Sequence, residues 1–225
     1  MKVNKYLIDL LRVIVIYLFF NFSLGILFEY TLNYNELINN YLYEKLTKQQ
    51  MNSYFLYKKK WQLFSYVFII IVFLMKTLLV SSVLYIGTFF FSKIKVIFKH
   101  LFYIVVKAEF VFLGVGVLKI VWFYFFQTNY TLEDLQYFYP LSALNIVGYK
   151  GLDSWFIYPL QTLNLFELAY WFLLAYYVGK IASPTKSKEE NKYPIDFGLK
   201  IVASSYGSAL LLWIVVVMFF TLNYS

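Results

Sequence analysis

The chain has 225 residues, of which 61% are apolar and 24% aromatic, and its formal net charge is +8. Soluble domains contain roughly 45–50% apolar residues, so this composition excludes an ordinary soluble protein and indicates a membrane protein. The absence of cysteine and the single histidine, His100, exclude a disulfide framework, thiolate metal sites and any site that needs two imidazoles.

Five long apolar runs predict five transmembrane helices in a single integral membrane domain that covers residues 1–225. A helix rises about 1.5 Å per residue, so roughly 20 residues cross the hydrocarbon core of a bilayer. The runs are continuous rather than alternating, which favours helices over the strands of a barrel. We therefore expect an all-α polytopic bundle with spans at about residues 10–31, 62–91, 108–126, 155–179 and 199–222.

The first run begins like a secretory signal, because basic residues precede its apolar core and small residues follow it. Apolar residues continue to Phe28, however, and Asp9 lies within the basic segment. We therefore expect this run to be retained as a membrane span.

The outer connection at residues 32–60 is long enough to contain a helix. Its apolar residues recur at helical spacing and leave one apolar face; they are Leu37, Ile38, Tyr41, Leu42 and Leu46. We expect an amphipathic helix that lies on the membrane interface or on the bundle. In the connection before the fourth span, Thr131 and Asp134 have the spacing of a helix start, and Pro140 limits that helix.

The expected inner connections are basic. Residues 93–107 alternate Lys with bulky apolar residues, a pattern typical of side chains that reach for anionic headgroups. Residues 180–198 contain two prolines and mixed charge, which predicts a cytoplasmic linker. Because most lysines lie at the ends of apolar runs, we expect the bilayer surface to be their partner and do not expect nucleic acid.

Lys and Arg are distributed unequally between the two sides of the predicted bundle. The amino-terminal segment carries three, the second connection four and the fourth connection five, which makes twelve, against six on the opposite side. Cytoplasmic loops carry the excess of positive charge. We therefore expect a cytoplasmic amino terminus, an external carboxyl terminus and a location in the inner (cytoplasmic) membrane of a cell.

Ionisable residues inside the spans are the strongest candidates for function, because an unpaired charge in lipid is costly. Lys76 lies midway along the second run, Lys119 just beyond the middle of the third, and Glu167 at the centre of the fourth. We expect Glu167 to pair with one of these lysines, with Asn164 one turn earlier on the same face. Glu109 is expected near the inner end of its span, at a different depth from Glu167.

That pairing leaves one of the two lysines without an acid. The remaining lysine is then neutral, or is reached by water or an anion, or extends its side chain to the interface. A salt bridge that only orients the helices and a polar path for transport are both compatible with this pattern.

The fifth run opens with small residues four positions apart, which predicts close packing of two helix backbones. These residues are Ala203, Ser204, Ser205, Gly207, Ser208 and Ala209. The partner helix belongs either to the same chain or to another copy of it.

The sequence contains no phosphate-binding loop, dinucleotide glycine pattern or His-Glu-x-x-His motif. We therefore expect no cofactor, no metal site and no enzymatic activity, and an intramembrane enzyme ranks last. The leading interpretation is a scaffold or accessory subunit of a membrane complex, which contacts other membrane subunits or itself. The alternative is a permease-like or pore-forming component, for transport or as a membrane-acting factor in a defence system, that uses Lys76, Lys119 and Glu167.

Two segments of the second half carry a family resemblance. They are NLFELAYWFLLAYYVG at residues 164–179 and, after the basic linker, SSYGSALLLW at residues 204–213. With these segments the chain resembles the YIP-domain (Ypt-interacting-protein) family, bacterial type, over at most residues 61–222. The resemblance implies five spans and a cytosolic amino terminus. Eukaryotic members engage small GTPases through a long amino-terminal region, but only about a dozen residues precede the first span here, so we do not expect that partner.

Overall fold

The structure is a computed structural model that describes residues 2–92, 94–183 and 194–224. These residues form helices and connections, and no β-strand occurs among them. Five helical runs are long and apolar enough to cross a membrane, which confirms the expected all-helical fold with five apolar helices. Their bounds are Lys5–Thr31, Lys48–Phe91, Phe98–Phe125, Leu165–Ala182 and Ile195–Tyr224.

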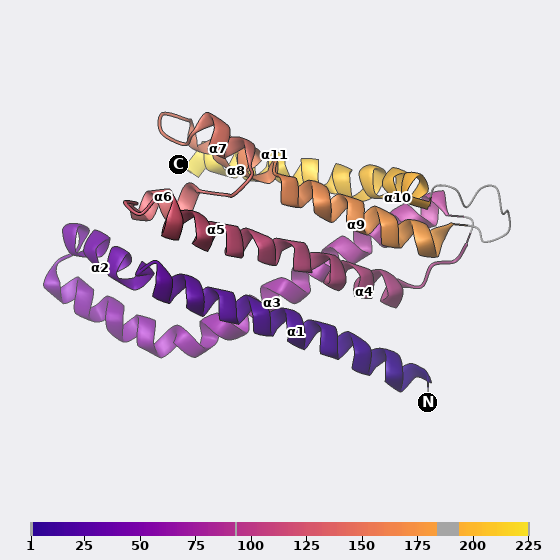
Figure 1. The fold of residues 1–225 in the computed structure, drawn as a ribbon, viewed down its shortest axis with the longest axis horizontal. Helices are drawn as coiled ribbons and strands as arrows, with labels where there is room; N and C mark the ends of the chain where they lie inside the picture. The colour runs from indigo at the N-terminus through magenta and orange to yellow at the C-terminus, as the bar shows by residue number, and fades with distance from the viewer. Residues whose placement is uncertain (1, 93, 184–193, 225) are drawn as a thin grey trace.

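The long helices follow the long axis of the molecule, and the two ends of the chain lie at opposite ends of that axis (Figure 1). Two of the five runs contain a short non-α turn. The third run consists of α4, the 3-10 turn η1 and α5, and the fifth of α10, the π-helical turn η3 and α11. The elements are α1 (Lys2–Thr31), α3 (Lys48–Phe91), α4 (Phe98–Ala108), η1 (Glu109–Phe112), α5 (Leu113–Phe125), α9 (Leu165–Ala182), α10 (Pro194–Val202), η3 (Ala203–Gly207) and α11 (Ser208–Tyr224).

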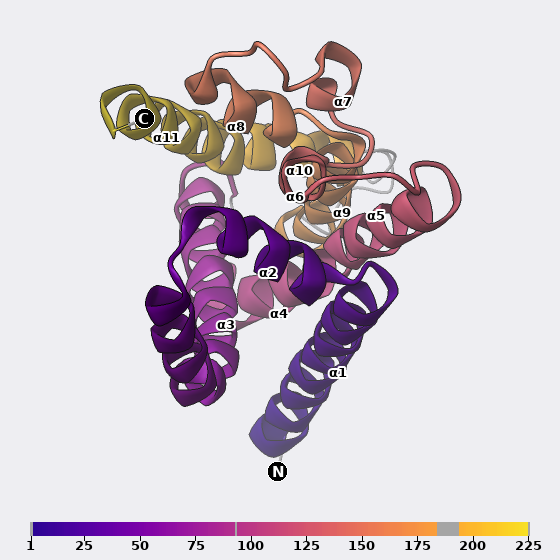
Figure 2. The ribbon, with the colours of Figure 1, turned by 90° about the vertical axis from the view of Figure 1, so that its left-hand side faces the viewer.

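Four short helices cover the end of the bundle opposite the amino terminus (Figure 1). They are α2 (Tyr34–Lys45), α6 (Leu132–Tyr137), α7 (Ala143–Val147) and α8 (Ser154–Thr162). Figure 2 views this end and shows α2 crossing from α1 to α3. The five apolar residues expected on one face of α2 and its carboxyl end are all half-buried. A capping box between Thr131 and Asp134 starts α6, which confirms the predicted helix start.

Several helices extend beyond the spans that the sequence predicts. The second helix begins at Lys48, after a capping box at Thr47, and not near residue 62. The third begins at Phe98, so the expected basic connection at 93–107 shrinks to a short link in which Lys93 lies outside the described residues. Lys99 and Lys107 lie on the helix, where Lys107 Nζ is 4.5 Å from the ring centroid of Tyr103. The expected linker at 180–198 overlaps the ends of α9 and α10, and residues 184–193 lie outside the described residues.

The fourth span, predicted at 155–179, is not one continuous helix, because the chain leaves the helix between α8 and α9. Asn164 adopts an extended backbone, and its side-chain oxygen accepts the N–H of Glu167 at 2.7 Å. The broken backbone is paired with the preceding connection: Ala143 N–H donates to Leu163 O at 2.8 Å, and Leu165 N–H donates to Leu141 O at 3.2 Å. These bonds satisfy polar groups that the break removes from the helix.

The main core lies where α9 meets α3, α4 and α10. Tyr170, Leu174 and Val178 are fully buried there. The closest approach is at Gly198 of α10, where an added Cβ would lie 1.8 Å from the carbonyl oxygen of Ala175. A glycine at this position therefore lets the α10 backbone rest directly on α9.

The Gly198 contact predicts a large asymmetry between two Gly→Ala substitutions. Gly198→Ala should destabilise the protein by about 1–3 kcal/mol, because the methyl group overlaps the α9 backbone. Gly25→Ala in α1 is the matched control, since nothing lies within 4 Å of its added Cβ. Thermal unfolding of the detergent-purified variants measures the difference, and equal midpoints would contradict the proposed backbone contact.

Candidate functional site

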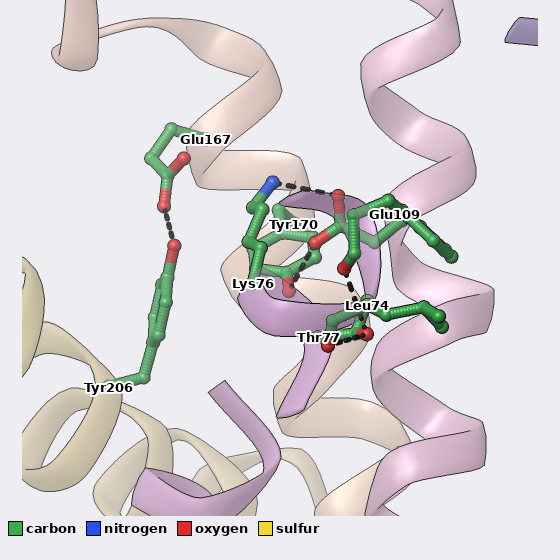
Figure 3. Close-up of polar contacts among 8 residues, drawn as sticks. Leu74, Lys76, Thr77, Glu109, Glu167, Tyr170 and Tyr206 are labelled. Atoms are coloured by element: carbon green, nitrogen blue, oxygen red, sulfur yellow. Dashed lines mark hydrogen bonds and ion pairs between the residues drawn. The ribbon is translucent and has the colours of Figure 1, made fainter. Parts of the chain in front are cut away.

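A partly buried ion pair joins α3 to η1. Lys76 Nζ lies 2.7 Å from Oε2 of Glu109, and the exposed fractions of the two side chains are 44% and 2%. Tyr170 of α9 donates its hydroxyl to the other Glu109 oxygen at 2.9 Å (Figure 3). Lys76 Nζ also lies 4.3 Å from the ring centroid of Phe112. Both carboxylate oxygens of Glu109 are therefore hydrogen-bonded, and its charge is balanced by one ammonium.

Glu167 forms the second part of the site, in the first turn of α9. Its Oε1 accepts the hydroxyl of Tyr206 at 2.7 Å (Figure 3). The same oxygen accepts the indole N–H of Trp171 at 3.0 Å. Tyr206 belongs to the π turn η3, a type of irregular turn that is frequent at functional sites. Both donors are neutral, so they orient the carboxylate without neutralising it.

The two parts of the site are in contact. The rings of Tyr170 and Tyr206 meet edge to face with centroids 5.5 Å apart. Glu109 and Glu167, which were expected at different depths, are thus linked indirectly through Tyr170 and Tyr206. The expected pairing of Glu167 with a lysine is wrong, since the ion pair of Lys76 is with Glu109.

Two local features explain these corrections. The third long helix begins at Phe98, ten residues before the expected start of its span, so Glu109 lies well inside the helical run. The break before α9 makes Asn164 the cap of that helix, where it bonds the backbone of Glu167 rather than its carboxylate. Neither feature follows from apolar periodicity.

Lys119 is separate from this cluster. It lies ten residues beyond Glu109, which is about 15 Å along a helix. Its Nζ is 5.6 Å from the ring centroid of Phe28 in α1. The sequence led us to expect two lysines and one acid together. The described site instead combines one lysine, Lys76, with two acids, Glu109 and Glu167.

A cavity of about 830 Å³ lies beside the cluster, between α3, α5, α8, α9 and α11. Its wall is mainly apolar, and its polar side chains are Lys76, Tyr139, Tyr158, Gln161, Thr162, Asn164, Glu167 and Tyr206. Cavities that hold small molecules commonly have this size and combine apolar walls with a few convergent polar groups. Burial, followed by the negative charges of Glu167 and Glu109, raises the pKa of Tyr139 to about 12.

The sequence did not point to the aromatic partners or to the cavity. Tyr170 and Trp171 stand three and four residues after Glu167, a spacing that places them on one helix face with it and could have identified them. Tyr206 is brought in by the π turn of a different span, so its contact has no local signal. In the described residues no three His, Asp or Glu side chains come together as metal ligands.

The predicted small-residue motif of the fifth run packs only in part. Gly207 is buried against Trp171, whose ring an added Cβ would approach to 2.5 Å. Ser205 lies against Gly87 of α3, where an added Cβ would approach its Cβ to 2.6 Å. Ala203, Ser204 and Ser208 are exposed in the single chain, so no helix of the same chain packs on them in the described residues, and their packing against another copy stays a prediction. The π turn changes the helical register, so residues four apart do not keep one face here.

Comparisons with protein-family models, with curated proteins and with solved structures find no match to this chain. The resemblance to the YIP-domain family therefore rests on the two sequence segments alone and stays a prediction.

The Lys76–Glu109 pair gives a double-mutant prediction. Lys76→Met leaves the buried Glu109 without its cation and should destabilise the protein by about 1–3 kcal/mol. Glu109→Gln should also destabilise it, whereas the double variant should recover much of the loss because no charge is left unpaired. Unfolding midpoints in detergent measure all three variants. Additive losses in the double variant would show that the two side chains are not coupled.

Proposed function

We propose that the protein is a permease-like membrane component that binds an amphipathic small molecule in the cavity beside Glu167. The observation that carries this proposal is a carboxylate that lines a cavity between membrane-spanning helices and has only neutral hydrogen-bond partners among the described residues. Ionisable groups at such positions commonly mark binding sites and transport paths.

A purely structural role accounts for only half of the cluster. The Lys76–Glu109 ion pair joins two helices, and Tyr170 joins the pair to a third. Glu167 adds no ion pair within 4.0 Å in the described residues, and a neutral glutamine would accept the same two hydrogen bonds. Its carboxylate therefore needs an explanation beyond packing, and a ligand in the cavity supplies one.

The broken fourth span also supports this function. Irregular backbone at membrane depth is tolerated where it is buried in protein or lines a cavity, and discontinuous helices form the binding sites of many transporters. Here the break between α8 and α9 contributes Thr162 and Asn164 to the cavity wall.

A second candidate function is the scaffold or accessory subunit that the sequence suggested. The observation in its favour is α1, because only 6% of its apolar window is buried within the chain. Most of this helix is thus available to lipid or to the helix of a partner subunit.

We also propose that the amino terminus is cytoplasmic and that the protein lies in the cytoplasmic membrane. The start of α1, the end of α9 and the start of α10 lie at one end of the molecule (Figure 1). The sequence places twelve of its Lys and Arg residues in the segments at this end and six at the other.

The transport proposal predicts ion movement that depends on Glu167. In liposomes with a pH-sensitive dye inside, the purified protein should dissipate an imposed ion or proton gradient, and Glu167→Gln should abolish this flux. Glu133→Gln is the matched control, because Glu133 is exposed and lies outside the cavity. A folded wild-type protein without flux would favour the accessory role, and flux that Glu167→Gln leaves unchanged would contradict the role assigned to Glu167.

The orientation is testable because the chain has no cysteine. Two single-cysteine variants serve as reporters. Asn129→Cys places the thiol in the connection before α6, and Ser187→Cys places it in the basic segment between α9 and α10. A membrane-impermeant maleimide should label the first variant on intact cells and the second only after permeabilisation. The reverse pattern would invert the proposed orientation.

A further inference from the structure

We infer that the cavity takes an organic cation with an apolar body, such as a protonated or quaternary amine, and that Glu167 is its counter-ion. This inference rests on the proposed function and names the class of molecule that the cavity binds.

The first argument is the balance of charge around the cavity. Among the residues that the structure describes, Lys76 is the only basic one in the cavity wall, and its ammonium lies 2.7 Å from Glu109. One ammonium balances one carboxylate, so an ionised Glu167 has no cation of its own among the described residues. A positively charged ligand would neutralise it inside the low-dielectric bundle, where charge pairing is strongest.

The second argument is the geometry of Glu167. Its hydrogen bonds within the described residues all fall on Oε1, and both come from neutral donors. The other oxygen, Oε2, has no such bond, and the side chain lines the cavity. A carboxylate that is fixed at one oxygen presents the second to a ligand in a defined position.

The third argument is the composition of the wall. Tyr139, Tyr158, Tyr206 and Trp213 line the cavity together with aliphatic side chains of α3 and α11. Aromatic faces attract cations, and the attraction grows when water is excluded. Quaternary and protonated amines are recognised by such combinations of aromatic rings and a carboxylate, while aliphatic surfaces contact the apolar part of the molecule.

The same features disfavour an anion. The ammonium of Lys76 is held between Glu109 and the ring of Phe112, and Lys119 lies over Phe28, away from the cavity. An anionic ligand would therefore share the ammonium of Lys76 with Glu109 and would meet the negative charge of Glu167, which lines the same cavity.

The experiment uses two probes of similar size and shape but opposite charge, tetraphenylphosphonium and tetraphenylborate. The full chain is placed in nanodiscs of phosphatidylcholine, and binding is measured by equilibrium dialysis with empty nanodiscs as the blank, because both ions partition into lipid. The cation should bind saturably, with at least tenfold higher affinity than the anion.

Two variants locate the site. Glu167→Gln should weaken cation binding at least tenfold while keeping the acceptor for Trp171 and Tyr206. Glu133→Gln should leave it unchanged. Ala209→Phe keeps every charge but fills part of the cavity, and it should reduce binding too. If Glu167→Gln fails to fold, the preference between the two probes and the effect of Ala209→Phe still decide whether the cavity binds a cation.

The outcomes separate this inference from the proposed function. Two results would overturn the cation assignment and leave the cavity as a binding site. The first is saturable binding of tetraphenylborate with an affinity equal to or higher than that of the cation. The second is cation binding whose affinity Glu167→Gln does not change. Saturable binding of neither probe by the folded protein would overturn the proposed function itself.

Discussion

The structure depends on the fact that lipid provides no hydrogen bonds, so every polar group between the helices needs a partner from the protein. Glu109 shows this most fully, since its side chain is 2% exposed, pairs with Lys76 and accepts the hydroxyl of Tyr170. These contacts connect α3, η1 and α9 through one carboxylate. The surrounding core, which includes the close crossing at Gly198, holds these helices in register for the pair.

Glu167 obeys the constraint in a different way. It receives two neutral hydrogen bonds and faces a cavity instead of a cation. Two departures from regular helix create this environment: the break at Asn164 opens the wall beside α8, and the π turn brings Tyr206 to the carboxylate. Both departures occur next to the cavity, which is why we connect them with ligand binding rather than with packing.

The parts of the fold that were predictable are those that apolar runs specify. Five spanning helices and the start of α6 follow from hydrophobicity and from a local capping pattern. The span boundaries were less predictable, because lysines such as Lys107 extend along aromatic rings and stay on the helix. Lys76, Glu109, Asn164 and Glu167 do meet at one site, but their pairing differs from the expected one, and Lys119 lies elsewhere.

The sequence by itself determined that this chain belongs in a membrane, that its described part is helical, and that a few charges lie at membrane depth. These properties depend on the composition of contiguous segments, and the hydrophobicity of such a segment is the sum over its residues. Only the tertiary structure decided which acid meets Lys76, which residues surround Glu167 and where a cavity remains. Those outcomes depend on helix rotation and on breaks in the helices, and a change of one residue in register redirects a side chain by about 100°.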